Sequence, residues 1–153
     1  MALASAAKLA DLLVFNQLSV HSKKRVFESA AEAFGDMIGL SKGAVYRGLL
    51  DREKLGSTAL GDGVAIPHCR IDECTAPLGC LMTLTDPVDF SASDGMGVDI
   101  VLVLLVPAQA TQEHLDLLAS VVELLSRETT RAAIRKANQP SELSDIVARG
   151  GLV

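Results

Sequence analysis

The sequence predicts an α/β protein, in which a central mixed sheet is flanked by helices in a three-layer α/β/α sandwich. Two segments with helical periodicity come first, short runs rich in Val, Ile and Leu fill the middle, and helical periodicity returns after Pro107. The 153 residues, 49% of them hydrophobic and 22% charged, are typical of a globular protein and suffice to bury a core. We therefore expect a single domain over residues 1–153.

Capping residues bound two predicted helices in the N-terminal half. Ser22 is suited to cap a helix over Lys23–Ile38, and the glycine that follows is suited to end it. Ser41 can cap a second helix over Lys42–Lys54, which Gly56 closes. The apolar residues of the first helix recur at three- and four-residue spacings: Val26, Phe27, Ala30, Phe34, Met37 and Ile38.

The middle of the chain changes to short apolar runs, which indicate strands. Residues 63–66, 78–85 and 99–106 are separated by turn residues, and Asp86-Pro87 breaks the second run. The third run is apolar without alternation, so we expect a central strand that is covered on both faces. Residues 12–20 form a further apolar segment, which fits either a strand or a turn of helix.

Helices return in the last third of the sequence. Thr111 can cap a helix from residue 112 to about residue 127, and a further helical stretch covers residues 129–136. Ser141 can cap a final helix over residues 142–149. Helices thus stand on both sides of the strands along the chain, as a layered sandwich requires.

Charge and cysteine content narrow the functional classes. A formal net charge of −5 argues against nucleic acid or an anionic membrane as the main partner. The longest uninterrupted apolar run, residues 100–106, is too short to span a bilayer. The three cysteines contain no Cys-x-x-Cys pair and are typical of reduced thiols, so we expect a cytoplasmic protein. Their spacing from His68 fits no zinc pattern.

Two histidines follow apolar strands and are candidates for chemistry. Within residues 63–70, Pro67 stops the strand ladder, so we expect His68 to leave the end of a strand in a defined direction. His114 falls on the inward side of its helix, at the third helical position if Thr111 is the cap, where free N–H groups favour an anion. That side chain is either a satisfied core residue or part of an anion site, and both remain open.

Two histidines and an arginine near one edge of a sheet suit phosphoryl chemistry. A neutral imidazole nitrogen is a good nucleophile, and a guanidinium group can hold two phosphate oxygens. The same groups equally suit acid–base hydrolysis. The residue types alone do not choose between these reactions.

Short motifs give further guidance, because their combination is more specific than any one of them. They are Arg52-Glu53, Leu55-Gly56-Ser57-Thr58 followed by Gly63-Val64-Ala65-Ile66-Pro67-His68, Val88-Asp89-Phe90 with Asp94-Gly95, Leu104-Leu105-Val106-Pro107 with His114-Leu115, and Ser141-Glu142-Leu143. Together they resemble the IIA domains of the bacterial phosphotransferase system, in the mannitol/fructose branch that includes the nitrogen-regulatory IIA protein. The resemblance extends over nearly the whole chain, from about residue 12 to about residue 147.

The resemblance implies a role for each site residue. His68 would accept a phosphoryl group from a phosphorylated HPr-like carrier, and His114 would hydrogen-bond to His68 or shape the site around it. Arg52 would neutralise the phosphate, while Ser57 and Thr58 would offer hydroxyl or backbone donors. Such transfer needs positioning and charge stabilisation, so no metal or other cofactor would be required.

The chain departs from the family pattern close to the predicted nucleophile. Cys69 stands where the family usually has glycine, Ala59 also replaces a usual glycine, and Gly97 stands where proline is common. A thiol beside the reactive ring would allow a redox effect on transfer. Arg70 also lies near, but the resemblance assigns neutralisation to Arg52 and leaves Arg70 as a contact for an acidic or phosphorylated partner.

The family implied by these motifs serves two roles. In sugar uptake, a IIA domain passes its phosphoryl group to a IIB domain. In the nitrogen-regulatory branch, it is a phosphorylation-dependent binding module for potassium-transport and sensor-kinase proteins. We expect the regulatory role, because this sequence contains no IIB domain and no membrane helix, and we keep the sugar relay as the alternative.

Overall fold

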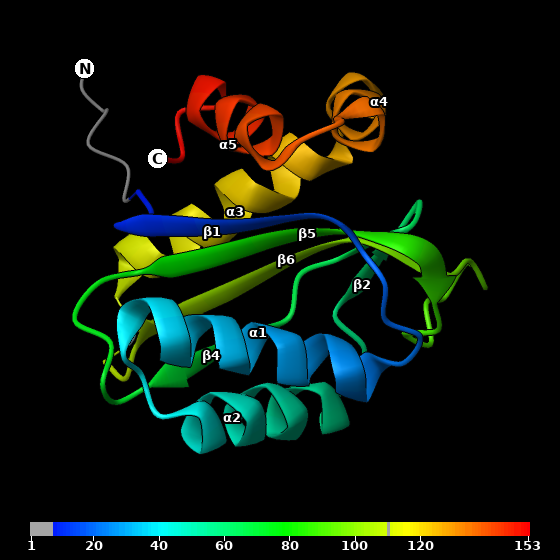
Figure 1. Cartoon of the computed structure of the whole chain (residues 1–153). Coiled ribbons are helices and arrows are strands. Elements are labelled where there is room, and N and C mark those ends of the chain that lie inside the picture. Colours follow the sequence, from blue (N-terminus) through cyan, green and yellow to red (C-terminus); the bar gives the residue numbers. More distant parts are fainter. Residues whose placement is uncertain (1–7, 110) are drawn as a thin grey trace.

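The structure is a computed structural model that describes residues 8–109 and 111–153. In this part of the chain, two helices cover one face of the sheet and three cover the other (Figure 1). The helices are α1 (Lys23–Ile38), α2 (Lys42–Lys54), α3 (Gln112–Ser126), α4 (Glu128–Lys136) and α5 (Pro140–Arg149). The predicted α/β/α sandwich is confirmed, and the first seven residues of the expected domain lie outside the described residues.

Six strands of the described chain form one mixed sheet. They are β1 (Asp11–Leu18), β2 (Ala59–Gly61), β3 (Val64–Ala65), β4 (His68–Ile71), β5 (Leu78–Val88) and β6 (Val98–Pro107). The order is β1-β5-β6-β3-β2, and β4 also pairs with β6. Strand β6 is antiparallel to β5 and parallel to both β3 and β4. Strands β3 and β4 therefore lie one after the other along the same edge of β6.

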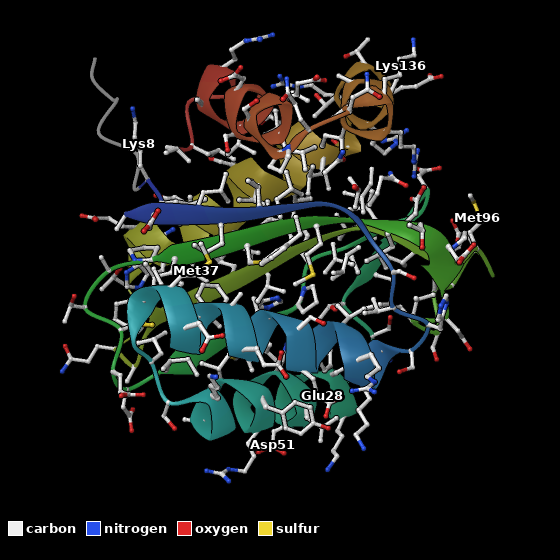
Figure 2. The ribbon with its side chains drawn as sticks, in the orientation of Figure 1. Lys8, Glu28, Met37, Asp51, Met96 and Lys136 are labelled. Carbon is white, nitrogen blue, oxygen red and sulfur yellow. The ribbon has the colours of Figure 1, made fainter. Side chains whose placement is uncertain are left out.

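Strand β6 runs through the centre of the core, as its apolar sequence predicts. Leu104 belongs to the buried cluster beneath α3, which includes Leu117, whereas the neighbouring Val103 belongs to the cluster beneath α1 and α2. Figure 2 shows side chains filling both spaces between sheet and helices, while the exposed Asp51 and Lys136 lie on the outer sides of the helical layers. The strand is thus covered on both faces.

The predicted caps set most of the helix boundaries. The side-chain oxygens of Ser22, Ser41 and Thr111 each accept a hydrogen bond from the N–H three residues later, which confirms the starts of three helices. The predicted cap at Ser141 is wrong, because Pro140 already occupies the first helical position. Proline fits there, since its fixed φ is helical and its missing N–H would have no helical partner. No helix in the described ranges is long and apolar enough to cross a membrane.

The strand predicted over residues 63–66 ends early, and a second strand begins at His68. The expectation that His68 leaves the end of a strand is therefore wrong. Pro67 has no N–H to donate to β6, although its carbonyl still accepts from the Leu104 N–H at 2.9 Å. The Ile66 N–H points to the other side and donates to the Thr58 carbonyl. Pairing resumes at His68, which places this residue beside the interior of β6 rather than at its end.

The remaining strands differ from the prediction in length. Residues 12–20, which fitted strand or helix, form most of β1. Strand β5 continues through Asp86-Pro87, where a break was expected, but its register with β6 shifts between Thr83 and Val88. The short strands β2 and β4 carry too few residues to show an alternating pattern in the sequence.

Candidate functional site

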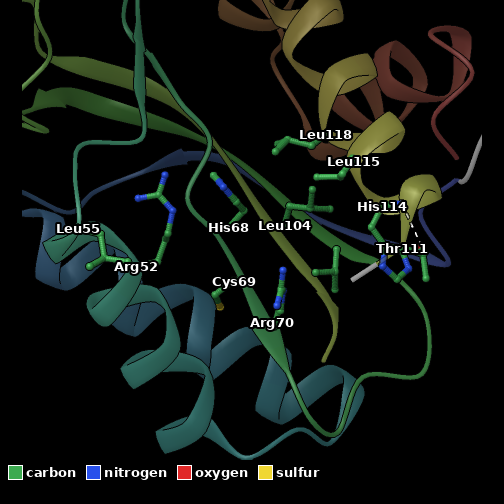
Figure 3. A pocket seen from close by; sticks show the side chains of 11 residues that line it. Arg52, Leu55, His68, Cys69, Arg70, Leu104, Thr111, His114, Leu115 and Leu118 are labelled. Atoms are coloured by element: carbon green, nitrogen blue, oxygen red, sulfur yellow. Dashed lines mark hydrogen bonds between the residues drawn. The ribbon is translucent and has the colours of Figure 1, made fainter. Parts of the chain in front are cut away.

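A pocket of about 460 Å³ lies where β4, the end of α2 and the start of α3 meet (Figure 3). Its polar or thiol-bearing lining residues are Arg52, His68, Cys69, Arg70, Thr111 and His114. Its apolar lining residues are Leu55, Leu104, Val106, Leu115 and Leu118. No carboxylate is among these residues. The pocket therefore presents two guanidinium groups and two imidazoles against an apolar wall.

His68 is the half-buried first residue of β4. Its Nδ1 lies 2.8 Å from the carbonyl oxygen of Ile66. A carbonyl can only accept a hydrogen bond, so in the neutral ring Nδ1 carries the proton and the lone pair lies on Nε2. The backbone two residues earlier thus sets the tautomer, and it leaves Nε2 as the nucleophilic nitrogen.

Arg52 stands in the last turn of α2 and reaches the same pocket. Its Nη1 donates to the Gly56 carbonyl oxygen at 3.0 Å, one turn later, where the helix leaves carbonyl groups without partners. This bond holds the guanidinium in place while using only part of its donors. In Figure 3 the Arg52 side chain rises from α2 toward the level of His68. Arg52 and His68 therefore line the same pocket, as the sequence led us to expect.

His114 lines the pocket from α3. It occupies the third helical position, and its N–H donates to the Thr111 hydroxyl at 3.4 Å, as the capping pattern predicts. Figure 3 shows the ring beside Thr111, apart from His68. Its Nδ1 is buried and has no hydrogen-bond partner among the described residues. The two histidine rings line one pocket, and no hydrogen bond joins them in residues 8–109 and 111–153.

The predicted donors Ser57 and Thr58 do not line the pocket, and their hydroxyl groups have other partners. The Ser57 hydroxyl donates to the Phe90 carbonyl at 2.5 Å. The Thr58 hydroxyl donates to Glu53 at 2.7 Å, and the Thr58 N–H donates to the same carboxylate at 3.2 Å. The structure therefore does not bring these two residues to the site, and a role in binding phosphate would require them to leave these bonds.

Glu53 is the residue that the sequence reasoning left without a role. Its side chain is 4% exposed, and besides the two bonds from Thr58 it receives one from Lys23 of α1 at 3.2 Å. The Lys23 ammonium also lies 5.3 Å from the centre of the Phe90 ring. This carboxylate joins α1, α2 and the segment before β2 directly behind Arg52. The Arg52-Glu53 pair was the only sign of this role in the sequence, but the pair alone does not show which of the two side chains is buried.

The Cys69 thiol packs against α2, although the residue also borders the pocket. A Cβ atom added at Gly48 of α2 would lie 3.0 Å from the Cys69 sulfur, so the helix approaches the strand closely at this glycine. Burial raises the pKa of the Cys69 thiol to about 12, and the thiol stays protonated at neutral pH. A protonated, packed thiol reacts poorly, which argues against the redox effect considered above.

The pocket combines a nucleophile with cationic groups and lacks an acidic partner. The hydrolytic alternative would be served by a carboxylate that orients a histidine base, yet His68 is oriented by a backbone carbonyl. An imidazole nitrogen flanked by guanidinium groups suits a negatively charged electrophile. The geometry favours phosphoryl transfer over acid–base hydrolysis.

Comparison with known proteins gives a consistent result. The family model described as "Phosphoenolpyruvate-dependent sugar phosphotransferase system, EIIA 2" matches residues 8–150. A nitrogen regulatory protein from Pseudomonas aeruginosa is 43% identical over 127 residues, covering 82% of this chain and 82% of that protein. The crystal structure of nitrogen regulatory protein IIA-Ntr from Neisseria meningitidis is similar with a TM-score of 0.80 and 37% identity, covering 90% of this chain and 92% of that chain.

A more distant structural match extends the comparison to the sugar branch. The mannitol IIA enzyme of Escherichia coli, in its complex with the phosphorylated IIB enzyme, has a TM-score of 0.73 and 19% identity. The match covers 89% of this chain and 94% of that chain. At this level of identity, the likeness shows the fold alone.

Proposed function

This chain belongs to the phosphotransferase system EIIA 2 family, with nitrogen regulatory IIA proteins among its relatives, and from this premise we propose that it carries a phosphoryl group on His68. The observation that carries the proposal is the hydrogen bond from Nδ1 to the Ile66 carbonyl, because it leaves the lone pair on Nε2 in a carboxylate-free pocket. The donor is a phosphorylated HPr-like carrier protein, and we place the reaction in the cytoplasm.

In the proposed reaction the Nε2 lone pair attacks phosphorus. A bond forms between Nε2 and phosphorus, the bond between phosphorus and the donor atom breaks, and its electron pair returns to the carrier protein. No electron is gained or lost by either protein, and Nδ1 keeps its proton. Arg52 stabilises the charge on the transferred oxygens, and His114 shapes the far wall of the pocket.

Replacing Arg52 by alanine is expected to slow phosphoryl uptake about 10²-fold, because one preorganised cationic donor to the transition state is removed. The fold should persist, since the lost bond to the Gly56 carbonyl lies at an exposed helix end. Rapid-quench measurement of phosphate incorporation at saturating carrier tests this expectation. The matched control is Lys54→Ala, which removes an exposed cation on α2 outside the pocket. Equal rates for Arg52→Ala and the unchanged protein would refute the role of Arg52.

We further propose that the phosphoryl group acts mainly as a switch for binding proteins of potassium transport and sensor kinases. The support is the sequence similarity to proteins named nitrogen regulatory protein. Phosphorylation adds about two negative charges to a pocket otherwise lined by cationic and apolar groups, which is enough to make or break a contact on that face. The alternative is a sugar relay that passes phosphate to a IIB domain, as in the mannitol complex.

A binding experiment separates the two roles. The protein, phosphorylated and unphosphorylated, is immobilised and probed with purified potassium-transport regulators, a sensor kinase and a fructose-type IIB domain. The regulatory role predicts that retention of at least one regulator depends on phosphorylation and that little phosphate passes to IIB. Rapid transfer to IIB without state-dependent retention would support the relay instead. His68→Ala, which cannot be phosphorylated at this position, serves as the control for the unphosphorylated state.

A further inference from the structure

Arg70 lies on the same face of β4 as His68. The two residues are two positions apart, so their side chains project from the same side of the strand, with α-carbons about 6.6 Å apart. They pair with Leu104 and Val106 of β6, and all four residues line the pocket. In the view of Figure 3, Arg70 lies between His68 and His114. The strand therefore places a cation next to the nucleophile, on the side away from Arg52.

The Arg70 guanidinium is available for a ligand. Its side chain is exposed, and within the described ranges it forms neither an ion pair nor a hydrogen bond, whereas Arg52 is bonded to Gly56. Asp72 and Glu73 line the neighbouring hollow with Arg70 and Arg47, but neither carboxylate forms an ion pair with Arg70. Its five N–H donors thus have no protein partner among residues 8–109 and 111–153, and they remain free to bind a ligand.

We propose that Arg70 is a second phosphate-binding residue, which contacts the phosphoryl group while it is exchanged between His68 and the partner protein. This rests on the proposed function of His68. During transfer, negative charge is spread over three phosphate oxygens, and a single guanidinium can hold only two of them in a fork. Arg52 binds from the end of α2 and Arg70 binds from β4, so that both flanks of the phosphoryl group are neutralised.

The side chains of Arg52 and Arg70 differ in conformational freedom, and we expect them to contribute differently to transfer for this reason. Arg52 is held by a backbone carbonyl and is preorganised. The Arg70 side chain is exposed and has no fixed partner in the described chain, so it can follow the phosphoryl group between donor and acceptor. A long, unrestrained arginine loses side-chain entropy when it binds, so its contribution is expected to be smaller than that of Arg52.

The test compares Arg70→Gln, Arg70→Lys and Arg47→Gln. Arg47 is the matched control, because it is an exposed arginine that lines the neighbouring hollow but not the His68 pocket. Transfer from a purified, phosphorylated bacterial HPr-type carrier is followed over a range of carrier concentrations. We expect Arg70→Gln to lower the rate at saturating carrier about tenfold, Arg70→Lys to restore part of it, and Arg47→Gln to leave it unchanged within about twofold.

Three outcomes would overturn the assignment. If Arg70→Gln left the rate at saturating carrier unchanged, Arg70 would not act on the transferred group. The same conclusion would hold if the substitution raised only the carrier concentration that gives half the maximal rate. An equal loss in Arg47→Gln would indicate general attraction of the carrier instead of phosphate contact. An unlabelled wild-type protein would overturn the proposed function itself, and with it the role of Arg70. Thermal unfolding at an unchanged temperature shows that the exposed substitutions leave the fold intact.

Discussion

Replacing His68 by alanine is expected to abolish phosphoryl uptake from a phosphorylated carrier. The pocket contains one other imidazole, His114, whose Nδ1 is buried and whose ring lies apart from His68 against α3. The substitution removes the His68 ring and with it Nε2, the proposed acceptor atom. The remaining pocket residues can still position a phosphoryl group, but they cannot replace the missing nucleophile. Incubation with labelled carrier followed by measurement of acid-labile, alkali-stable phosphate gives the result directly.

Two control variants make this loss specific. His21→Ala removes an exposed histidine near Asp86, far along the sequence from the pocket residues, and should be labelled normally. His114→Ala should still be labelled, but more slowly, because it changes the wall of the pocket and not the acceptor. Acid-labile label in His68→Ala at the wild-type level would show that another residue carries the phosphate.

Replacing Glu53 by alanine is expected to destabilise the protein by about 3–5 kcal/mol, the largest stability effect we anticipate from a polar substitution. The change leaves the buried N–H and hydroxyl of Thr58, and the half-buried Lys23 ammonium, without their shared acceptor. Uncompensated buried donors and charges are what make such truncations costly. Urea denaturation monitored by circular dichroism measures the change in the free energy of unfolding.

The comparison with Glu28→Ala isolates the effect of burial. Glu28 forms an ion pair with Arg25 on the outer side of α1, at 3.4 Å, and its removal should cost less than about 1 kcal/mol. Thr58→Val removes one of the three donors to Glu53 and should fall between the two variants. If Glu53→Ala and Glu28→Ala lowered stability equally, the carboxylate would not hold α1, α2 and the chain before β2 together as argued above.

The helical layers could be predicted from the sequence because their signals are local. Three helices begin at a capping residue whose side chain accepts a hydrogen bond from the N–H three residues later: Ser22, Ser41 and Thr111. The apolar residues of a helix also recur with a regular period over several turns. The apolar run of β6 likewise predicts a strand that is buried on both faces. The order of the strands in the sheet could not be predicted from the sequence. Pairing between β4 and β6, for example, joins residues about 36 positions apart.

The site could be predicted only in part, because some of its features depend on contacts between distant parts of the chain. His68, Arg52 and His114 were identified and do line one pocket. Arg70 was set aside, because the resemblance assigned neutralisation of the phosphate to Arg52. The strand β4 and its pairing with β6 show that Arg70 shares a face with His68. The resemblance assigned Ser57 and Thr58 to phosphate binding, but their hydroxyl groups donate to the Phe90 carbonyl and to the buried Glu53 instead. Competition for donors is a tertiary property that no short motif contains.

Under the proposed function, the carbonyl of Ile66 would affect how readily a phosphoryl group leaves His68. Once Nε2 carries phosphorus, a ring that keeps its Nδ1 proton is a cation, and the carbonyl oxygen, 2.8 Å from Nδ1, stabilises that form. A cationic ring departs from phosphorus as neutral imidazole, which is a far better leaving group than an imidazolate anion. In the proposed reaction, a backbone atom that no side-chain substitution removes would therefore favour transfer of the phosphoryl group from His68 over its storage there.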